Sequence, residues 1–163
     1  METPSSVGFR IGKVAKTTLF FSFFGPVIGM VVFGVGYFFL ESGLFAAIAS
    51  LVLFFLPPFL GIGLPVAFYV GFLPSVASGF FVGGYTALVV NPKWEVVFGI
   101  GFLIGVLQII LFGVGDMPPP RYTVVSKLEP LLALQILTVA TCAVTTMLCW
   151  GGVRLWNQER LKS

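Results

Sequence analysis

Charged residues are confined to short regions of the chain, and long uncharged stretches separate them. The charged positions are Glu2, Arg10, Lys13, Lys16, Glu41, Lys93, Glu95, Asp116, Arg121, Lys127, Glu129, Arg154, Glu159, Arg160 and Lys162. The uncharged stretches cover 17–40, 42–92, 96–115 and 130–153. About 20 apolar residues in a helix cross the roughly 30 Å hydrocarbon layer of a bilayer. Three stretches match one crossing each, and the longest one has to fold back on itself.

This pattern predicts an all-α fold, a polytopic transmembrane helix bundle of about five hydrophobic helices. The predicted helices cover 17–40, 44–60, 65–90, 96–115 and 131–152. Pro57 and Pro58 should end the second helix, because proline lacks an amide donor and restricts the residue before it. An uncharged turn is expected at 61–65. The expected domains are a basic N-terminal lead-in at 1–16, the transmembrane domain at 17–152 and a basic C-terminal tail at 153–163.

Helix length and charge disagree on the number of crossings. Five crossings divide the Lys and Arg residues almost equally between the two sides of the membrane. If the segment 44–60 only dips into the bilayer and returns, four crossings place most of these cations on the N-terminal side, as the positive-inside rule prefers. Because Leu44 to Leu60 is long and apolar enough to span, we predict five crossings and keep four as the alternative.

Small residues recur along one face of the predicted third helix. Every fourth residue is small over the series Ala67, Gly71, Ser75, Gly79, Gly83 and Ala87. A ridge of small side chains lets a neighbouring helix backbone approach closely. Two further pairs have the same spacing, Gly25 with Gly29 and Gly101 with Gly105. We interpret all of these as helix-packing positions, the alternative being the chance recurrence of common residues.

Prolines and tryptophans add local expectations. Pro26 and Pro74 lie inside predicted helices, where each removes a backbone hydrogen bond and favours a kink. Trp94, Trp150 and Trp156 lie close to charged ends of the apolar stretches. Because tryptophan is enriched at the boundary between lipid and water, we expect these three to be interfacial anchors.

The composition excludes an ordinary soluble domain. Hydrophobic residues make up 58% of the 163 residues and charged residues 9%, whereas soluble domains contain about 25% charged residues. The formal net charge is +3, and the cations are not clustered on a soluble surface as they are in nucleic-acid-binding domains. We therefore expect the lipid bilayer as the surrounding medium and no nucleic-acid partner.

The residue types leave little room for catalysis. The chain has no histidine, which removes imidazole ligands and imidazole acid–base chemistry. All Asp and Glu residues lie at or beyond predicted helix ends, so no buried carboxylate pair is expected. Cys142 and Cys149 lie on one face of the last helix and are expected to pack rather than to bond. We expect no catalytic residues, no metal site and no cofactor, and therefore not an enzyme.

One family resemblance concerns the first half of the chain. The run Phe24 to Gly29 contains Gly-Pro-x-Ile-Gly, and the run Ala67 to Ser75 followed by Gly79 contains Ala-x-Tyr-x-Gly-x-x-Pro. In these motifs the chain is similar to small, uncharacterised inner-membrane proteins of Gram-negative bacteria. The likeness covers about residues 20–90. It implies a location in the bacterial cytoplasmic (inner) membrane and implies no activity.

Two functions are compatible with these patterns. The first is a structural, interaction or accessory membrane protein that packs through its small-residue faces, with a membrane-protein partner or a homo-oligomer. The second is a small oligomeric transporter or channel for a small solute. Its path would use the kinks at Pro26 and Pro74 and the polar positions Gln135, Thr138, Thr141 and Thr145.

Overall fold

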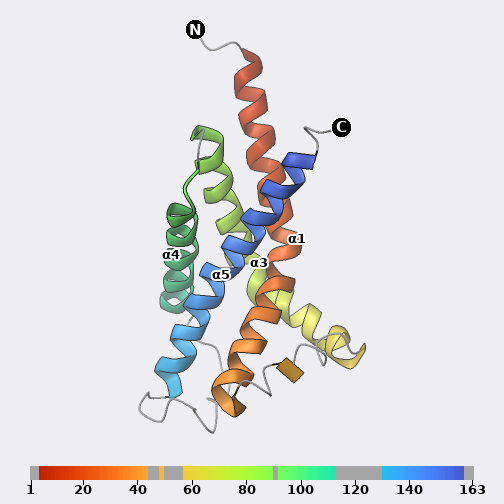
Figure 1. Ribbon diagram of the computed structural model, residues 1–163, viewed down its shortest axis with the longest axis vertical. Coiled ribbons are helices and arrows are strands. Elements are labelled where there is room, and N and C mark those ends of the chain that lie inside the picture. The colour runs from red at the N-terminus through yellow and green to blue at the C-terminus, as the bar shows by residue number, and fades with distance from the viewer. Residues whose placement is uncertain (1–3, 44–47, 50–56, 90–91, 113–129, 160–163) are drawn as a thin grey trace.

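A computed structural model describes residues 4–43, 48–49, 57–89, 92–112 and 130–159. Its elements are helices: α1 is Pro4–Ser42, α3 is Pro57–Leu88, α4 is Trp94–Phe112 and α5 is Pro130–Glu159 (Figure 1). Over these residues the fold is an all-α bundle, as the sequence predicts.

The bundle is that of an integral membrane protein. Four helices are long and apolar enough to cross a bilayer, one within each of α1, α3, α4 and α5. The expected count of about five helices is therefore wrong for the described part of the chain. The predicted second helix at 44–60 is divided: 57–60 belong to α3, and 44–47 and 50–56 lie outside the described residues.

Two helix starts differ from the predicted ones. α1 begins at Pro4 rather than at 17, so the basic lead-in forms one helix with the first apolar stretch. α3 begins at Pro57 and runs through 61–65, where the sequence predicts a turn. Prolines are tolerated in the first helical turn because the amides there have no partner within the helix. Pro57 and Pro58 therefore start a helix instead of ending one.

The four helices alternate in direction. α1 and α4 run away from the end of the molecule at which α1 begins, and α3 and α5 run back toward it (Figure 1). The amino ends of α1 and α4 and the carboxyl ends of α3 and α5 consequently lie toward the same end. We refer to this as the N-terminal end of the bundle. α1 packs against both α3 and α5, and α4 packs mainly against α5.

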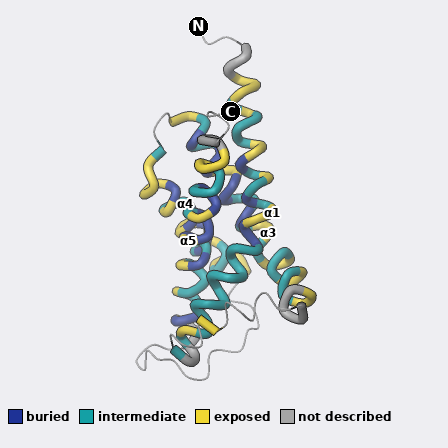
Figure 2. Tube along the Cα trace, turned by 45° about the vertical axis from the view of Figure 1, so that its right-hand side comes forward, coloured by how far each residue is buried: buried dark blue, intermediate teal, exposed yellow. Residues whose placement is uncertain are grey.

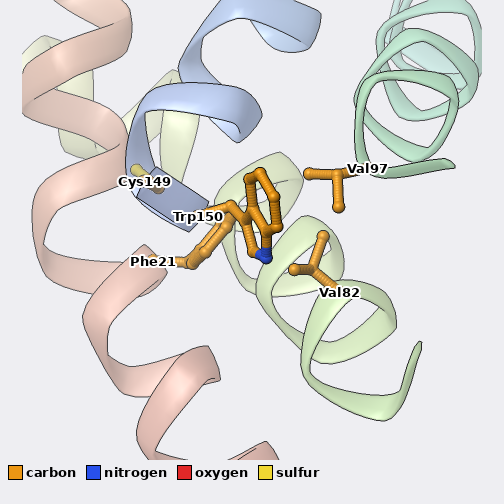
Figure 3. Close-up of a cluster of buried hydrophobic side chains, with 5 residues drawn as sticks. All are labelled: Phe21, Val82, Val97, Cys149 and Trp150. Atoms are coloured by element: carbon orange, nitrogen blue, oxygen red, sulfur yellow. The ribbon is translucent and has the colours of Figure 1, made fainter. Parts of the chain in front are cut away.

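Large apolar side chains are divided between a small core and a wide outer surface. The core cluster contains Phe21 of α1, Val82 of α3, Val97 of α4, and Cys149 and Trp150 of α5 (Figure 3). Buried segments follow the inner faces of the helices, and exposed segments lie outside (Figure 2). Exposed apolar side chains such as Leu103, Ile110 and Leu148 are stable in acyl chains and costly in water.

Candidate functional site

The ridge of small residues on α3 faces α1. A β-carbon built at Gly79 would lie 2.9 Å from the Cα atom of Thr18 and 2.7 Å from Cβ of Phe21. At Gly83 it would lie 3.1 Å from the Cα atom of Val14. Since the nearest atoms include the backbone of α1, these two positions admit no larger side chain without moving a helix. The central part of the ridge is thus used for packing within the chain.

The two proline positions meet at the same level of this contact. Gly25 lies against the side chain of Ser75, and a β-carbon at Gly71 would lie 3.3 Å from the Cα atom of Pro26. Pro74 precedes Ser75 in sequence, so both interrupted turns lie side by side. Both helices continue through their prolines. Each proline leaves the carbonyl four residues before it without an amide partner in the helix.

The other predicted glycine positions, Gly29, Gly101 and Gly105, face α5. A β-carbon at Gly101 would lie 2.9 Å from the Cα atom of Ala143, and one at Gly105 would lie 2.9 Å from that of Val139. Gly29 faces the side chain of Thr145 at a more ordinary 3.7 Å. Ala67 and Ala87, at the two ends of the ridge on α3, are half-buried.

Hydroxyl groups gather between α3 and α5 near the middle of the bundle. Thr146 Oγ1 lies 3.3 Å from Ser78 Oγ and donates to the carbonyl oxygen of Cys142 at 2.7 Å. The thiol of Cys142 in turn donates to Oε1 of Gln108 on α4 at 3.3 Å. We call these residues, together with the buried Thr141 and Thr145, the central polar cluster. It joins three helices through side chains that carry no charge.

Two members of the central polar cluster have hydroxyl groups without a hydrogen-bond partner among the described residues. Thr141 and Thr145 are each 8% exposed, and their Oγ1 atoms have no hydrogen-bond partner among the described residues. Thr145 lies about 16 Å along α5 from Trp156, at roughly 1.5 Å per residue. With Trp156 at the membrane interface, as the sequence predicts, this is about half of the hydrocarbon thickness. Neutral hydroxyls at this depth can bind a polar solute or water, but they cannot act as strong acids or bases.

A shallow apolar groove lies between α4 and α5. Its volume is about 320 Å³, and Gln135 is the polar residue of its lining. The other lining residues are Phe98, Phe102, Ile109, Ile136, Val139, Ala140 and Ala143. The sequence places Gln135 in line with Thr138, Thr141 and Thr145 as one possible path. In the structure Gln135 belongs to this groove, whereas Thr141 and Thr145 are buried in the interior.

The N-terminal end of the bundle holds a cation bound to a helix terminus. Lys13 Nζ on α1 donates to the carbonyl oxygen of Thr86, in the last turn of α3, at 2.6 Å. The last carbonyls of a helix lack amide partners and carry partial negative charge, so a cation there is stabilising. The backbone amide of Lys93 donates to Tyr85 Oη at 3.0 Å, which closes the connection to α4. Sequence reasoning did not identify this contact, because only the fold brings Lys13 to the end of α3.

α1 extends beyond its neighbours at this end. Its residues up to 16, which we call the N-terminal extension, include large apolar side chains that are 54%, 74% and 65% exposed at Val7, Phe9 and Ile11. β-carbons built at Gly8 and Gly12 would meet no atom within 4 Å. Arg10, Lys13 and Lys16 recur along it at helical spacing.

The three tryptophans are placed differently from one another. Trp94 and Trp156 are 56% and 51% exposed near the N-terminal end of the bundle. Trp150 is 9% exposed and packs in the core cluster, with the guanidinium carbon of Arg154 5.6 Å from its ring centroid. The expected anchoring role does not fit Trp150, because the faces of four helices converge on its indole and separate it from lipid.

Within the described ranges, no group of three or more His, Cys, Asp or Glu side chains is arranged to hold a metal ion. Comparison of the chain with protein-family models, with curated proteins and with solved structures gave no match. The candidate features are therefore the central polar cluster and the N-terminal extension.

Proposed function

We propose that the chain is an accessory or interaction protein of a membrane, and that it recognises a protein partner. The observation that carries this proposal is the N-terminal extension, a helix with exposed Val7, Phe9 and Ile11. Large apolar side chains exposed together on one helix favour association with another surface. The small-residue faces support it less than the sequence suggested, because Gly79, Gly83 and the other close positions pack within the chain.

We place the N-terminal end of the bundle on the cytoplasmic side of a bacterial inner membrane. Two of the nine Lys and Arg residues, Arg121 and Lys127, lie in the sequence between α4 and α5. The other seven precede α3, lie between α3 and α4, or lie at the end of α5 and after it. This asymmetry supports a cytoplasmic N-terminus under the positive-inside rule. The motifs at Gly25 to Gly29 and Ala67 to Gly79 support the bacterial location by resemblance only.

Crosslinking in the native host tests the proposal. A photoreactive amino acid is introduced singly at exposed positions that sample the extension and each helix, such as Ile11, Phe80, Leu103 and Leu148. A reproducible adduct with one defined polypeptide, identified by mass spectrometry, is expected from at least one position. If every position yields adducts with lipid alone, the chain is not an interaction protein.

The central polar cluster supports a second candidate, a small transporter or channel for a neutral solute. Unpartnered hydroxyls of Thr141 and Thr145 lie at mid-depth, close to the level at which Pro26 and Pro74 interrupt their helices. Transporters commonly bind their substrates near the midplane beside interrupted helices. Flux of small neutral solutes into proteoliposomes should fall when both threonines are replaced by valine. Flux equal to that of empty vesicles with the unmodified protein would eliminate this candidate.

A further inference from the structure

The contact between α1 and α5 places two glycines of α1 opposite one face of α5. A β-carbon built at Gly29 would lie 3.7 Å from Oγ1 of Thr145, and Gly36 lies against the side chain of Leu137. Leu137, Thr141 and Thr145 follow one another at intervals of four residues, which places them on one face of the helix. Thr141 therefore lies on the side of α5 that faces α1, between the levels of the two glycines.

The hydroxyl of Thr145 is directed at Gly29. Its Oγ1 is nearer to a β-carbon built there than its Cγ2, which lies at 3.9 Å. Apart from the adjoining residues and backbone of α1, no other described atom lies within 4 Å of that position. At Gly101, by contrast, Oγ1 of Thr146 lies only 2.7 Å from the corresponding position. Gly29 thus leaves room for about one heavy atom beside a buried hydroxyl.

Thr141 and Thr145 differ from other threonines of α5 in their hydrogen bonding. Thr138 and Thr146 donate to carbonyl oxygens one turn earlier in the helix, at 2.9 and 2.7 Å. Thr141 and Thr145 are each 8% exposed, and no described residue bonds to their Oγ1 atoms. Buried polar groups in folded proteins are nearly always hydrogen-bonded to protein or to ordered water. Two unpartnered hydroxyls on one buried face therefore indicate a polar molecule bound between α1 and α5.

Size and charge restrict what this molecule can be. Residues four apart on a helix have β-carbons about 5–6 Å apart, and two hydrogen bonds of about 2.8 Å to one shared atom cover that span. Hydroxyls both donate and accept, so they suit a molecule that does the same. The stretches 17–40 and 130–153 contain no charged residue, so an ion would be buried without a counter-charge, at high cost. The molecule is therefore neutral and about as large as water.

We propose that a water molecule, or a neutral solute of its size, binds between α1 and α5 in the space beside Gly29, hydrogen-bonded to Oγ1 of Thr141 and of Thr145. The site goes beyond the interaction role proposed above. It also names the class of solute for the second candidate function, although binding does not depend on transport. Such a molecule has two sources, water held permanently in the bundle and a solute in passage through it.

Magnetic resonance of the full chain in lipid nanodiscs tests the site, with water as the probe. The threonine methyl groups are isotope-labelled, and magnetisation transfer from water protons to each methyl group is measured. We expect transfer to Thr141 and Thr145 and none to Thr146. Thr146 is the matched control, because it is adjacent in sequence, 2% exposed and bonded to its own helix. If Thr141 and Thr145 receive no more transfer than Thr146, the proposal is wrong.

Substitutions test the position of the molecule. Gly29→Ala fills the space with a methyl group at an ordinary contact distance from Thr145, so the bundle should fold and the transfer to Thr145 should be lost. Gly84→Ala adds a methyl group on α3 where a β-carbon meets nothing within 4 Å, and should leave the transfer unchanged. Thr145→Val keeps the side-chain shape and should reduce transfer to Thr141 several-fold, which decides the matter if Gly29→Ala does not fold. Transfer that persists in both variants contradicts the site.

Permeability measurements separate the two sources and the two proposals. Shrinkage of proteoliposomes in an osmotic gradient reports the passage of water. Transfer at Thr145 with the permeability of empty vesicles supports water held permanently, and eliminates transport while the site stands. A higher permeability that falls in Gly29→Ala supports a site on a path for small solutes. Solute flux without transfer to Thr141 or Thr145 contradicts the site and leaves the transport candidate standing.

Discussion

The two parts of α1 have the same secondary structure and opposite surroundings. From Thr17 onward, residues of α1 pack against α3 and α5, and Thr17 and Phe21 are almost completely buried. In the N-terminal extension the contacts with α3 are at Val14 and Lys13, and Phe9, nearer to the N-terminus, is 74% exposed. The difference arises because α3 ends at Leu88 and α4 begins at Trp94, so neither helix extends alongside the first turns of α1. Helix formation here is local, whereas burial depends on where the other helices end.

The glycines illustrate the same contrast. Gly12 in the extension has open space where a β-carbon would be, whereas Gly79 on α3 has the backbone of α1 there. Glycine lowers helix stability relative to alanine by about 1 kcal/mol in either place. Only at Gly79 is that cost offset by the close approach of a second helix. The predictions that follow test this division between packed and unpacked parts.

The largest effect is expected in the packed part, for Gly79→Val. The added side chain collides with Thr18 and Phe21, and overpacking of this kind costs about 1–3 kcal/mol. The SDS-induced unfolding midpoint of the purified protein in mild detergent should fall accordingly. Gly84→Val is the matched control on the same helix, because a β-carbon there meets nothing within 4 Å. Equal losses in both variants would show that helix propensity, and not packing against α1, determines the effect.

A smaller loss is expected for Thr146→Val in the central polar cluster. The substitution keeps the shape of the side chain and removes the hydroxyl that lies 3.3 Å from Ser78 Oγ. Side-chain hydrogen bonds between membrane helices contribute about 0.6 kcal/mol on average. Thr138→Val serves as the control, since Thr138 bonds to the carbonyl of Leu134 in its own helix. In the same assay the unfolding midpoint of Thr146→Val should be lower than that of Thr138→Val. A lower midpoint for Thr138→Val would contradict the interhelical role of Thr146.

At the boundary between the two parts, Lys13→Met should weaken the contact with the end of α3. The interaction of a cation with a helix carboxyl terminus contributes about 0.3–1 kcal/mol and is screened by salt. The loss should therefore be larger at low ionic strength than at high ionic strength. Lys16→Met is the comparison, because Lys16 is exposed on the extension. If both variants respond identically to salt, the bond to Thr86 does not contribute.

The smallest effect on the whole molecule is expected for Gly12→Ala in the extension. Alanine stabilises a helix relative to glycine by up to about 1 kcal/mol locally, and no neighbour obstructs the new methyl group. Hydrogen exchange of backbone amides around residue 12 should slow several-fold, while the unfolding midpoint of the bundle stays unchanged. A shift of that midpoint would mean that the extension is coupled to the bundle and is not an independent arm.

Particular elements show how far sequence reasoning reached. The fourth and fifth predicted helices correspond closely to α4 and α5, because an uncharged stretch of about 20 residues has one stable arrangement in lipid. The segment around Pro57 was misinterpreted, since proline is tolerated in the first turn of a helix and disfavoured in its interior. The pattern of residues alone does not say which of these positions a proline occupies. The choice of five crossings over four rested on the length of 44–60, most of which lies outside the described residues.

The candidate sites could be predicted from the sequence less completely than the fold. The sequence identified Gly79, Gly83, Gly101 and Gly105 as packing positions, but not that their neighbours belong to the same chain. It identified the threonines of α5, but not which hydroxyls would reach another helix. Whether a hydroxyl bonds to its own helix or to a neighbouring one depends on interhelical distance and rotation.

The sequence by itself determined that this protein belongs in a bilayer and that its spanning segments are helices. These properties follow from hydropathy and from the need to satisfy backbone amides inside lipid, which are local. Only the tertiary structure decided that the small-residue ridge is used internally, that Trp150 is buried, and that the first turns of α1 stand clear of the bundle. Those properties depend on how far neighbouring helices extend and how closely they approach.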